Sequence, residues 1–220
     1  MTHPAAPPHL LVMDVDSTFI TAEVVELLAD RAGSGALVAQ VTERAMRGEL
    51  DFAQSLHERV ATLEGLPESV FEDVLAEVEL SPGAERLVTT VQEHGWHVGL
   101  VSGGFVEIVA PLAARLGITL VRANRLGVAD GRLTGRVVGD VVDRAAKAAT
   151  LREYARATGT AFEHTVAIGD GANDLDMMAV AAYSVAYRAK PLVRAAADAT
   201  IEHRLDEVLD LPFVRAALGA

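Results

Sequence analysis

Two carboxylates two residues apart, Asp14 and Asp16, directly follow an apolar run in the stretch LLVMDVDST, residues 10–18. A carboxylate is ionised at neutral pH, so Asp14 needs no base in order to act as a nucleophile. If its target is a phosphate monoester, two anions must meet, and a cation held between them makes that approach favourable. Asp16 then remains as the group that protonates the leaving oxygen and later activates water.

A second acidic cluster, GDGAND at 169–174, offers further oxygen ligands for such a cation. Hard oxygen ligands suit Mg²⁺, and we expect Asp14, the backbone carbonyl of Asp16 and Asp170 to hold it. Asp174 supplies another carboxylate nearby. Zinc is not expected, because the chain has no cysteine and its seven histidines are scattered.

A phosphoryl group also needs donors, and Ser102, Gly103 and Gly104 offer a hydroxyl and backbone N–H groups before a helical pattern. Lys147, in RAAKAATL, adds a point charge. Taken singly, each motif also fits a helix cap or a tight turn, and a lone lysine is most often a solvated surface charge. Their joint occurrence at successive strand ends favours catalysis.

The elements that must position these residues alternate between buried strands and helices. Apolar runs at 10–14, 97–104 and 165–171 each end in small and polar residues, and 118–123 and 183–187 are weaker strand candidates. This alternation predicts an α/β fold with a doubly wound, Rossmann-like parallel sheet. The carboxyl ends of its strands would bring the motifs to one edge.

The segment 22–80 differs, because it contains successive amphipathic helical patterns and no strand pattern. A helical insertion after the first strand predicts a cap over the catalytic edge that excludes water and selects the substrate. A β-hairpin flap is expected at 124–139, where Asp130-Gly131 lies between alternating apolar positions. The expected organisation is a flexible leader at 1–8, the core at 9–21 and 81–220, and the helical cap at 22–80.

The composition of the 220 residues restricts the partners. With 31 acidic and 19 basic residues the net charge is −12, and we find no local basic patch, so no nucleic-acid partner is expected. No run approaches about 18 apolar residues, so no membrane partner is expected. The absence of cysteine and of a secretory signal predicts a cytoplasmic protein.

The motifs DVDST, SGG, Lys147 and GDGAND follow the order of the four motifs of the haloacid dehalogenase-like phosphatases, and the chain resembles that family. The resemblance extends over nearly 9–210 to its phosphoserine-cleaving members, through stretches at 45–60, 101–105, 124–135 and 166–178. It implies Mg²⁺-dependent hydrolysis of O-phospho-L-serine to L-serine and phosphate, the last step of serine biosynthesis, through an aspartyl-phosphate on Asp14.

The resemblance also implies roles for individual core residues. Asp16 would act as the acid and base, and Ser102, Gly103 and Lys147 would hold the phosphoryl group. Asn173 would support the phosphate. Mg²⁺ would bind Asp14, Asp16 and Asp170, with Asp174 supporting those ligands.

In the expected cap, the resemblance places Glu23 against the serine ammonium and Arg59 against its carboxylate, with Met46 and Phe52 as an apolar wall. A zwitterionic head group requires one anion and one guanidinium fork at fixed spacing, so this pairing is physically sensible. From residue type alone, Glu23 and Arg59 would be exposed helix charges.

Two other functions remain open from the sequence. A phosphotransferase would use the same aspartyl-phosphate and pass phosphate from phosphoserine to another alcohol such as homoserine. A non-catalytic sensor would bind phosphoserine or serine and signal through the cap. The presence of Asp14 together with Asp16 disfavours the sensor, because a complete nucleophile and acid set is a catalytic signature.

Overall fold

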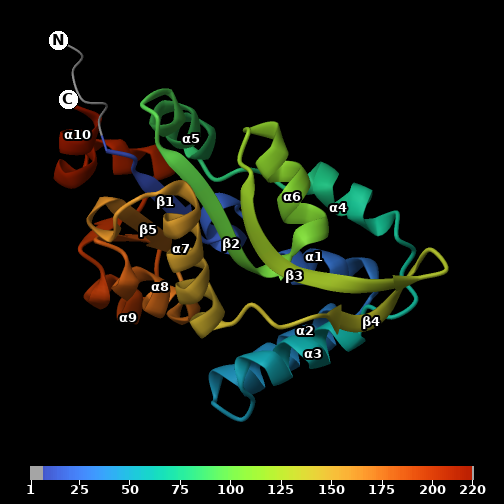
Figure 1. Ribbon diagram of the computed structural model, residues 1–220. Coiled ribbons are helices and arrows are strands. Elements are labelled where there is room, and N and C mark those ends of the chain that lie inside the picture. Colours follow the sequence, from blue (N-terminus) through green and yellow to red (C-terminus); the bar gives the residue numbers. More distant parts are fainter. Residues whose placement is uncertain (1–6, 220) are drawn as a thin grey trace.

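The computed structural model describes residues 7–219, apart from the side chain of Met46, and most of the predicted leader therefore lies outside the described residues. One seven-stranded sheet forms its centre (Figure 1). The strands are β1 (Leu10–Met13), β2 (His97–Phe105), β3 (Leu120–Ala129), β4 (Arg132–Val138), β5 (Thr165–Gly169), β6 (Tyr183–Tyr187) and β7 (Ala199–Ile201).

The strands are ordered β4-β3-β2-β1-β5-β6-β7, and every neighbouring pair is parallel except β3 with β4. The α/β fold class predicted from the sequence is confirmed. The expected hairpin is β3–β4, and its turn residues Asp130 and Gly131 have φ of 50° and 69°. Both values are left-handed, as a two-residue hairpin turn requires. The short strand β7 carries no period-two pattern long enough to predict.

Two apolar cores cover the two faces of the sheet, because side chains alternate along each strand. In β1, Leu11 and Met13 face one core, and Leu10 and Val12 face the other. The first core is completed by α5 (Ala84–Glu93), α6 (Val106–Arg115) and α10 (Pro212–Leu218), and the second by α7 (Arg144–Thr158), α8 (Leu175–Val180) and α9 (Pro191–Ala196).

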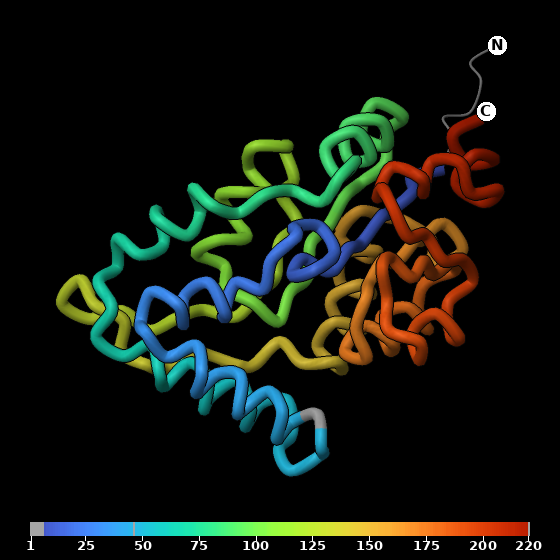
Figure 2. Tube along the Cα trace, turned by 180° about the vertical axis from the view of Figure 1, so that it is seen from behind, coloured from blue at the N-terminus to red at the C-terminus, as the bar shows by residue number. Residues whose placement is uncertain are grey.

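Between β1 and α5 the chain forms α1 (Val24–Arg31), α2 (Gly35–Met46), α3 (Phe52–Ala61) and α4 (Val70–Glu77), which we call the helical segment. Helices α2 and α3 lie side by side and project from the rest of the molecule (Figures 1 and 2). A capping box fixes the start of α3: Asp51 accepts the Gln54 N–H at 2.8 Å, and Gln54 accepts the Asp51 N–H at 3.0 Å. The division into cap and core at the expected boundaries stays a prediction. Among the described residues, no helix has the length and apolar character needed to cross a bilayer.

Candidate active site

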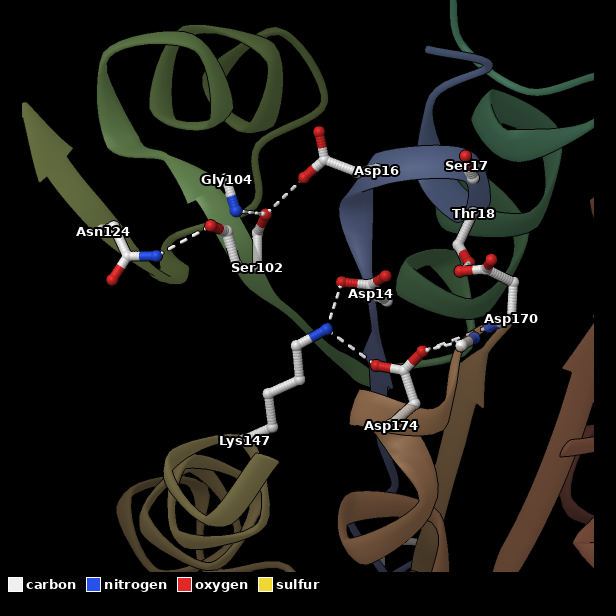
Figure 3. Close-up of polar contacts among 12 residues, drawn as sticks. Asp14, Asp16, Ser17, Thr18, Ser102, Gly104, Asn124, Lys147, Asp170 and Asp174 are labelled. Carbon is white, nitrogen blue, oxygen red and sulfur yellow. Dashed lines mark hydrogen bonds and ion pairs between the residues drawn. The ribbon is translucent and has the colours of Figure 1, made fainter. Parts of the chain in front are cut away.

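Asp14 lies at the carboxyl end of β1, where it is 3% exposed and its backbone N–H donates to the Ile168 carbonyl of β5 at 3.0 Å. The chain then enters the irregular helical turn η1 (Val15–Phe19), in which Ser17 has a left-handed φ of 58°. This turn directs the Asp16 side chain toward β2, where its Oδ2 accepts a hydrogen bond from Ser102 Oγ at 2.7 Å (Figure 3). Its Oδ1 accepts the backbone N–H of Val24 at 2.8 Å.

The carboxyl end of β2 carries two glycines, Gly103 and Gly104, and has no room for larger side chains at either position unless its neighbours shift. A Cβ on Gly104 would lie 2.5 Å from the Asp16 carboxylate, and one on Gly103 would lie 2.9 Å from the Phe52 ring. Buried Asn124 holds this end of β2, because its Nδ2 donates to the Gly103 carbonyl at 2.7 Å and its Oδ1 accepts the Val142 N–H at 2.8 Å. Sequence reasoning missed Asn124, the first residue of the expected hairpin at 124–139, because its role depends on contacts with other segments.

Lys147 is fully buried, unlike the solvated charge that its residue type alone suggests. Its Nζ donates to Asp14 Oδ1 at 2.5 Å and to Asp174 Oδ1 at 2.7 Å (Figure 3). Burial alone would lower the pKa of Lys147, but the two carboxylates outweigh burial and raise it. Burial and repulsion from Asp174 raise the pKa of Asp14 well above its ordinary value. The site therefore holds a charged lysine against crowded acids.

Carboxylate oxygens of Asp14, Asp170 and Asp174 lie within 4.8 Å of one another, so these residues could hold a metal ion. Asp174 also organises its neighbours, because its Oδ2 accepts the N–H groups of Asp170 at 3.2 Å and Gly171 at 3.0 Å. Burial and repulsion from Asp174 raise the pKa of Asp170 to about 6. Clustered oxygen donors with unfavourable negative charge fit a hard divalent cation.

A cavity of about 500 Å³ lies between this edge of the sheet and the helical segment. The strand ends and the loops that follow them line it with Asp14, Asp16, Gly103, Asp170 and Asn173. The helical segment and the residue before it line it with Glu23, Phe52 and Arg59. Ser102, Lys147 and Asp174 are fully buried around it. The predicted contribution of Met46 lies outside the described side chains.

Glu23 and Arg59 are half-buried on the cavity wall, not exposed as residue type alone would suggest. Ser17 Oγ donates to Glu23 Oε1 at 2.7 Å, and Arg59 Nε donates to the Ser55 carbonyl at 3.2 Å. Burial and repulsion from Asp16 raise the pKa of Glu23 to about 7. Burial lowers the pKa of Arg59 from its usual value.

Sequence reasoning missed Ser17, which positions Glu23, and two further residues that line the cavity, Glu26 and Lys190. Lys190 could have been considered, because it follows the expected strand at 183–187 and the ends of parallel strands share one edge. Glu26 carries no distinguishing pattern within its helix.

Comparison with known proteins places this geometry in a family. The chain is 53% identical over 203 residues to the phosphoserine phosphatase SerB2 of Mycobacterium tuberculosis, which covers 92% of this chain and 50% of that protein. It is 51% identical over 205 residues to a phosphoserine phosphatase of Streptococcus thermophilus, covering 91% and 95%. The chain thus spans about half the length of the Mycobacterium relative and nearly all of the Streptococcus one.

A solved structure described as a phospho-aspartyl intermediate analogue of phosphoserine phosphatase superposes with a TM-score of 0.87 at 38% identity, covering 93% of this chain and 98% of that one. The family model for haloacid dehalogenase-like hydrolases matches residues 11–179, which include the ends of β1, β2 and β5. The acidic cluster lies at the carboxyl edge of the parallel strands, within the residues that this family model matches. The chain therefore belongs to the haloacid dehalogenase-like hydrolase family.

Proposed function

We propose that this protein hydrolyses O-phospho-L-serine to L-serine and phosphate through an aspartyl-phosphate on Asp14. One observation carries the proposal: a single cavity joins Asp14 to an anion and a guanidinium, Glu23 and Arg59. Phosphoserine carries the matching groups, a phosphate, an ammonium and a carboxylate. The names of the relatives support the same substrate.

The chemistry requires two displacements at phosphorus. An Asp14 carboxylate oxygen attacks, the phosphorus–oxygen bond to serine breaks, and Asp16 gives its proton to the departing oxygen. Asp16 then takes a proton from water, which attacks phosphorus and restores Asp14. The Val24 N–H fixes the Asp16 carboxylate for both steps. The Ser102 hydroxyl donates to Asp16 in the substrate-free site and would turn to a phosphoryl oxygen when the substrate binds.

The remaining core residues stabilise charge. Lys147 holds one Asp14 oxygen at 2.5 Å and lies where it can offset charge on the phosphoryl group. The Ser102 hydroxyl and the backbone of Gly103 offer donors to phosphoryl oxygens, and Asn173 lines the cavity beside them. When bound, Mg²⁺ would offset the repulsion between the Asp14 carboxylate and the phosphate dianion. Asp14, the Asp16 carbonyl and Asp170 would hold it, with Asp174 keeping Asp170 and the lysine in place.

Removing the Arg59 guanidinium should abolish the preference of the protein for substrates that carry a carboxylate. In Arg59→Met we expect kcat/KM for phosphoserine to fall roughly 100-fold or more, because the substrate carboxylate loses its half-buried cationic partner. Phosphoethanolamine has the ammonium and phosphate but no carboxylate, so its kcat/KM should change less than about 3-fold. Phosphate release from both compounds with Mg²⁺ measures this.

The matched control is Arg44→Met, which removes a half-buried arginine of α2 that pairs with Glu58 and is not among the residues lining the cavity. Arg44→Met should leave kcat/KM for phosphoserine and for phosphoethanolamine near the values of the unmodified protein. Equal losses for the two compounds in Arg59→Met would contradict the assignment of Arg59 to the carboxylate, and no release from phosphoserine by the unmodified protein would overturn the proposed function.

Mg²⁺ should stabilise the fold, and more strongly at neutral than at acid pH. At about 100 times its Kd it should add about 2.7 kcal/mol, roughly 5–10 °C in Tm. The raised pKa values of Asp14 and Asp170 mean that the metal-free fold retains protons which the metal must displace. The Tm increase should therefore shrink as the pH falls through about 6. Thermal unfolding with Mg²⁺ or EDTA near pH 7.5 and near pH 5 checks it.

Asp170→Asn provides the control for this Tm shift, because it keeps the side-chain shape and removes one candidate ligand charge. A full Mg²⁺ shift in Asp170→Asn, or an equal shift at both pH values, would argue against a metal at this cluster.

A further inference from the structure

The cavity wall carries more negative than positive charge. Among the described residues that line it, two are cationic, Arg59 and Lys190. Five are acidic: Asp14, Asp16, Glu23, Glu26 and Asp170. The whole chain adds a net charge of −12. A phosphate monoester is mainly a dianion above its second pKa of about 6, so both fields oppose its approach. Mg²⁺ at the acidic cluster would offset part of this repulsion, and a cation at the entrance would attract the dianion further.

Lys190 occupies the side of the cavity formed by the core. It lies directly before α9, it is exposed, and its backbone N–H donates to the Asp170 carbonyl at 3.1 Å. That hydrogen bond ties its position to the loop that also carries Gly171 and Asn173. Arg59, the other lining cation, projects from α3 in the helical segment. The two cations therefore come from opposite walls, and Lys190 belongs to the wall that carries the acidic cluster.

The use of lysine in this chain is unusual. Of its 19 basic residues only two are lysines, and the other 17 are arginines. Lys147 is buried against the nucleophile, and Lys190 lines the same cavity. Positive charge elsewhere on the protein is supplied by arginine. A compact, flexible ammonium forms a point charge for phosphate, whereas a guanidinium fork pairs with planar carboxylates, of which this cavity has five.

We infer that Lys190 attracts the phosphate dianion into the cavity and holds it at the entrance before the reaction, a role that rests on the proposed function. Lys190 is exposed, so it remains free to meet an incoming anion, whereas Lys147 is closed off from solvent behind Asp14. The Arg59 guanidinium is taken by the substrate carboxylate. Lys190 is thus a positioning residue and takes no part in proton transfer.

Kinetics at two ionic strengths should reveal this role. Clefts lined by charge of one sign raise the on-rates of their ligands about 10-fold to 1000-fold at low salt, and one cation in this cavity should act at the lower end of that range. We expect Lys190→Met to lower kcat/KM for phosphoserine about 10-fold, chiefly through KM, with kcat within about 2-fold. Screening should reduce the difference to below about 3-fold near 0.5 M NaCl. Inhibition by inorganic phosphate should weaken in parallel.

Two variants separate this effect from loss of structure or of net charge. Lys190→Arg keeps the charge and should recover part of the kcat/KM that Lys190→Met loses, with the remainder lost because the guanidinium also pairs with the carboxylates of the cavity. Arg215→Met removes one positive charge from the exposed face of α10, and it should change kcat/KM less than about 2-fold. An unchanged KM in Lys190→Met, a loss that salt does not reduce, or an equal loss in Arg215→Met would overturn the role of Lys190.

The scarcity of lysine allows a direct binding measurement. An amine-acetylating reagent has only Lys147, Lys190 and the α-amino group as amine targets in this chain, and Lys147 is fully buried. Peptide mass spectrometry should show acetylation of Lys190, slowed several-fold by inorganic phosphate with Mg²⁺ and less by serine. Equal acetylation with and without phosphate would contradict the proposal. If the unmodified protein still releases phosphate from phosphoserine, such a result refutes the role of Lys190 alone and leaves the proposed function standing.

Discussion

Asp14→Asn should abolish phosphate release and leave the fold intact. The expected fall in kcat is at least about 10⁴-fold, because the proposed mechanism forms the covalent intermediate on Asp14. Asparagine preserves the shape and can still accept a hydrogen bond from Lys147. Since burial and Asp174 already make the Asp14 charge unfavourable, its removal should leave the free energy of unfolding within about 1 kcal/mol. Single-turnover phosphate release and urea unfolding measure the two effects.

Two further observations strengthen this test. Acid-quenched reactions of the unmodified protein should carry a phosphoryl group on the peptide that contains Asp14, and those of Asp14→Asn should not. Asp14→Ala serves as the control for trace deamidation of asparagine back to aspartate. Turnover within 10-fold of the unmodified protein in freshly purified Asp14→Ala would refute the nucleophile.

The second large effect concerns stability. Lys147→Met should lower the free energy of unfolding at neutral pH by about 3–5 kcal/mol, because Asp14 and Asp174 would remain as buried carboxylates without their cation. When the pKa of a carboxyl group is raised in the folded state, the protein loses stability as the pH rises through that pKa. The loss of stability caused by Lys147→Met should therefore be smaller near pH 5 than near pH 7. Urea unfolding in EDTA at both pH values gives the measurement.

The double variant Lys147→Met/Asp14→Asn separates charge from packing. Removing one carboxylate together with the cation should recover a substantial part of the lost stability, since the two residues are in direct contact. If the double variant is no more stable at pH 7 than Lys147→Met, the loss arises from packing of the side chain and the electrostatic explanation fails.

The strand ends could be predicted from the sequence because their signal is local. The apolar runs before Asp14, Ser102 and Asp170 break abruptly into polar residues, and parallel topology brings such ends together. The resulting fold class is confirmed by the sheet, and the family resemblance is confirmed by the matches. The roles of the individual residues stay predictions.

The burial of Lys147 and the place of Asn124 could not be predicted, because each depends on contacts between distant segments. Lys147 meets Asp14 across 133 positions of sequence, and Asn124 binds the Gly103 carbonyl from the neighbouring strand β3. The left-handed Ser17 is a further example, since serine at that position carries no glycine-like signal. Residue type predicts exposure for a lysine, and only the tertiary structure overrides it.

The two hydrogen bonds to Asp16 join parts of the protein that are far apart in the chain. One comes from the first residue of α1, where the helical segment begins, and the other comes from the end of β2 in the sheet. A rotation of α1 away from β2 would break one of these hydrogen bonds and change the orientation of the Asp16 carboxylate. In the proposed mechanism, proton transfer by Asp16 would therefore depend on the position of α1 against the end of β2, which links the chemistry at the sheet edge to the placement of the helical segment.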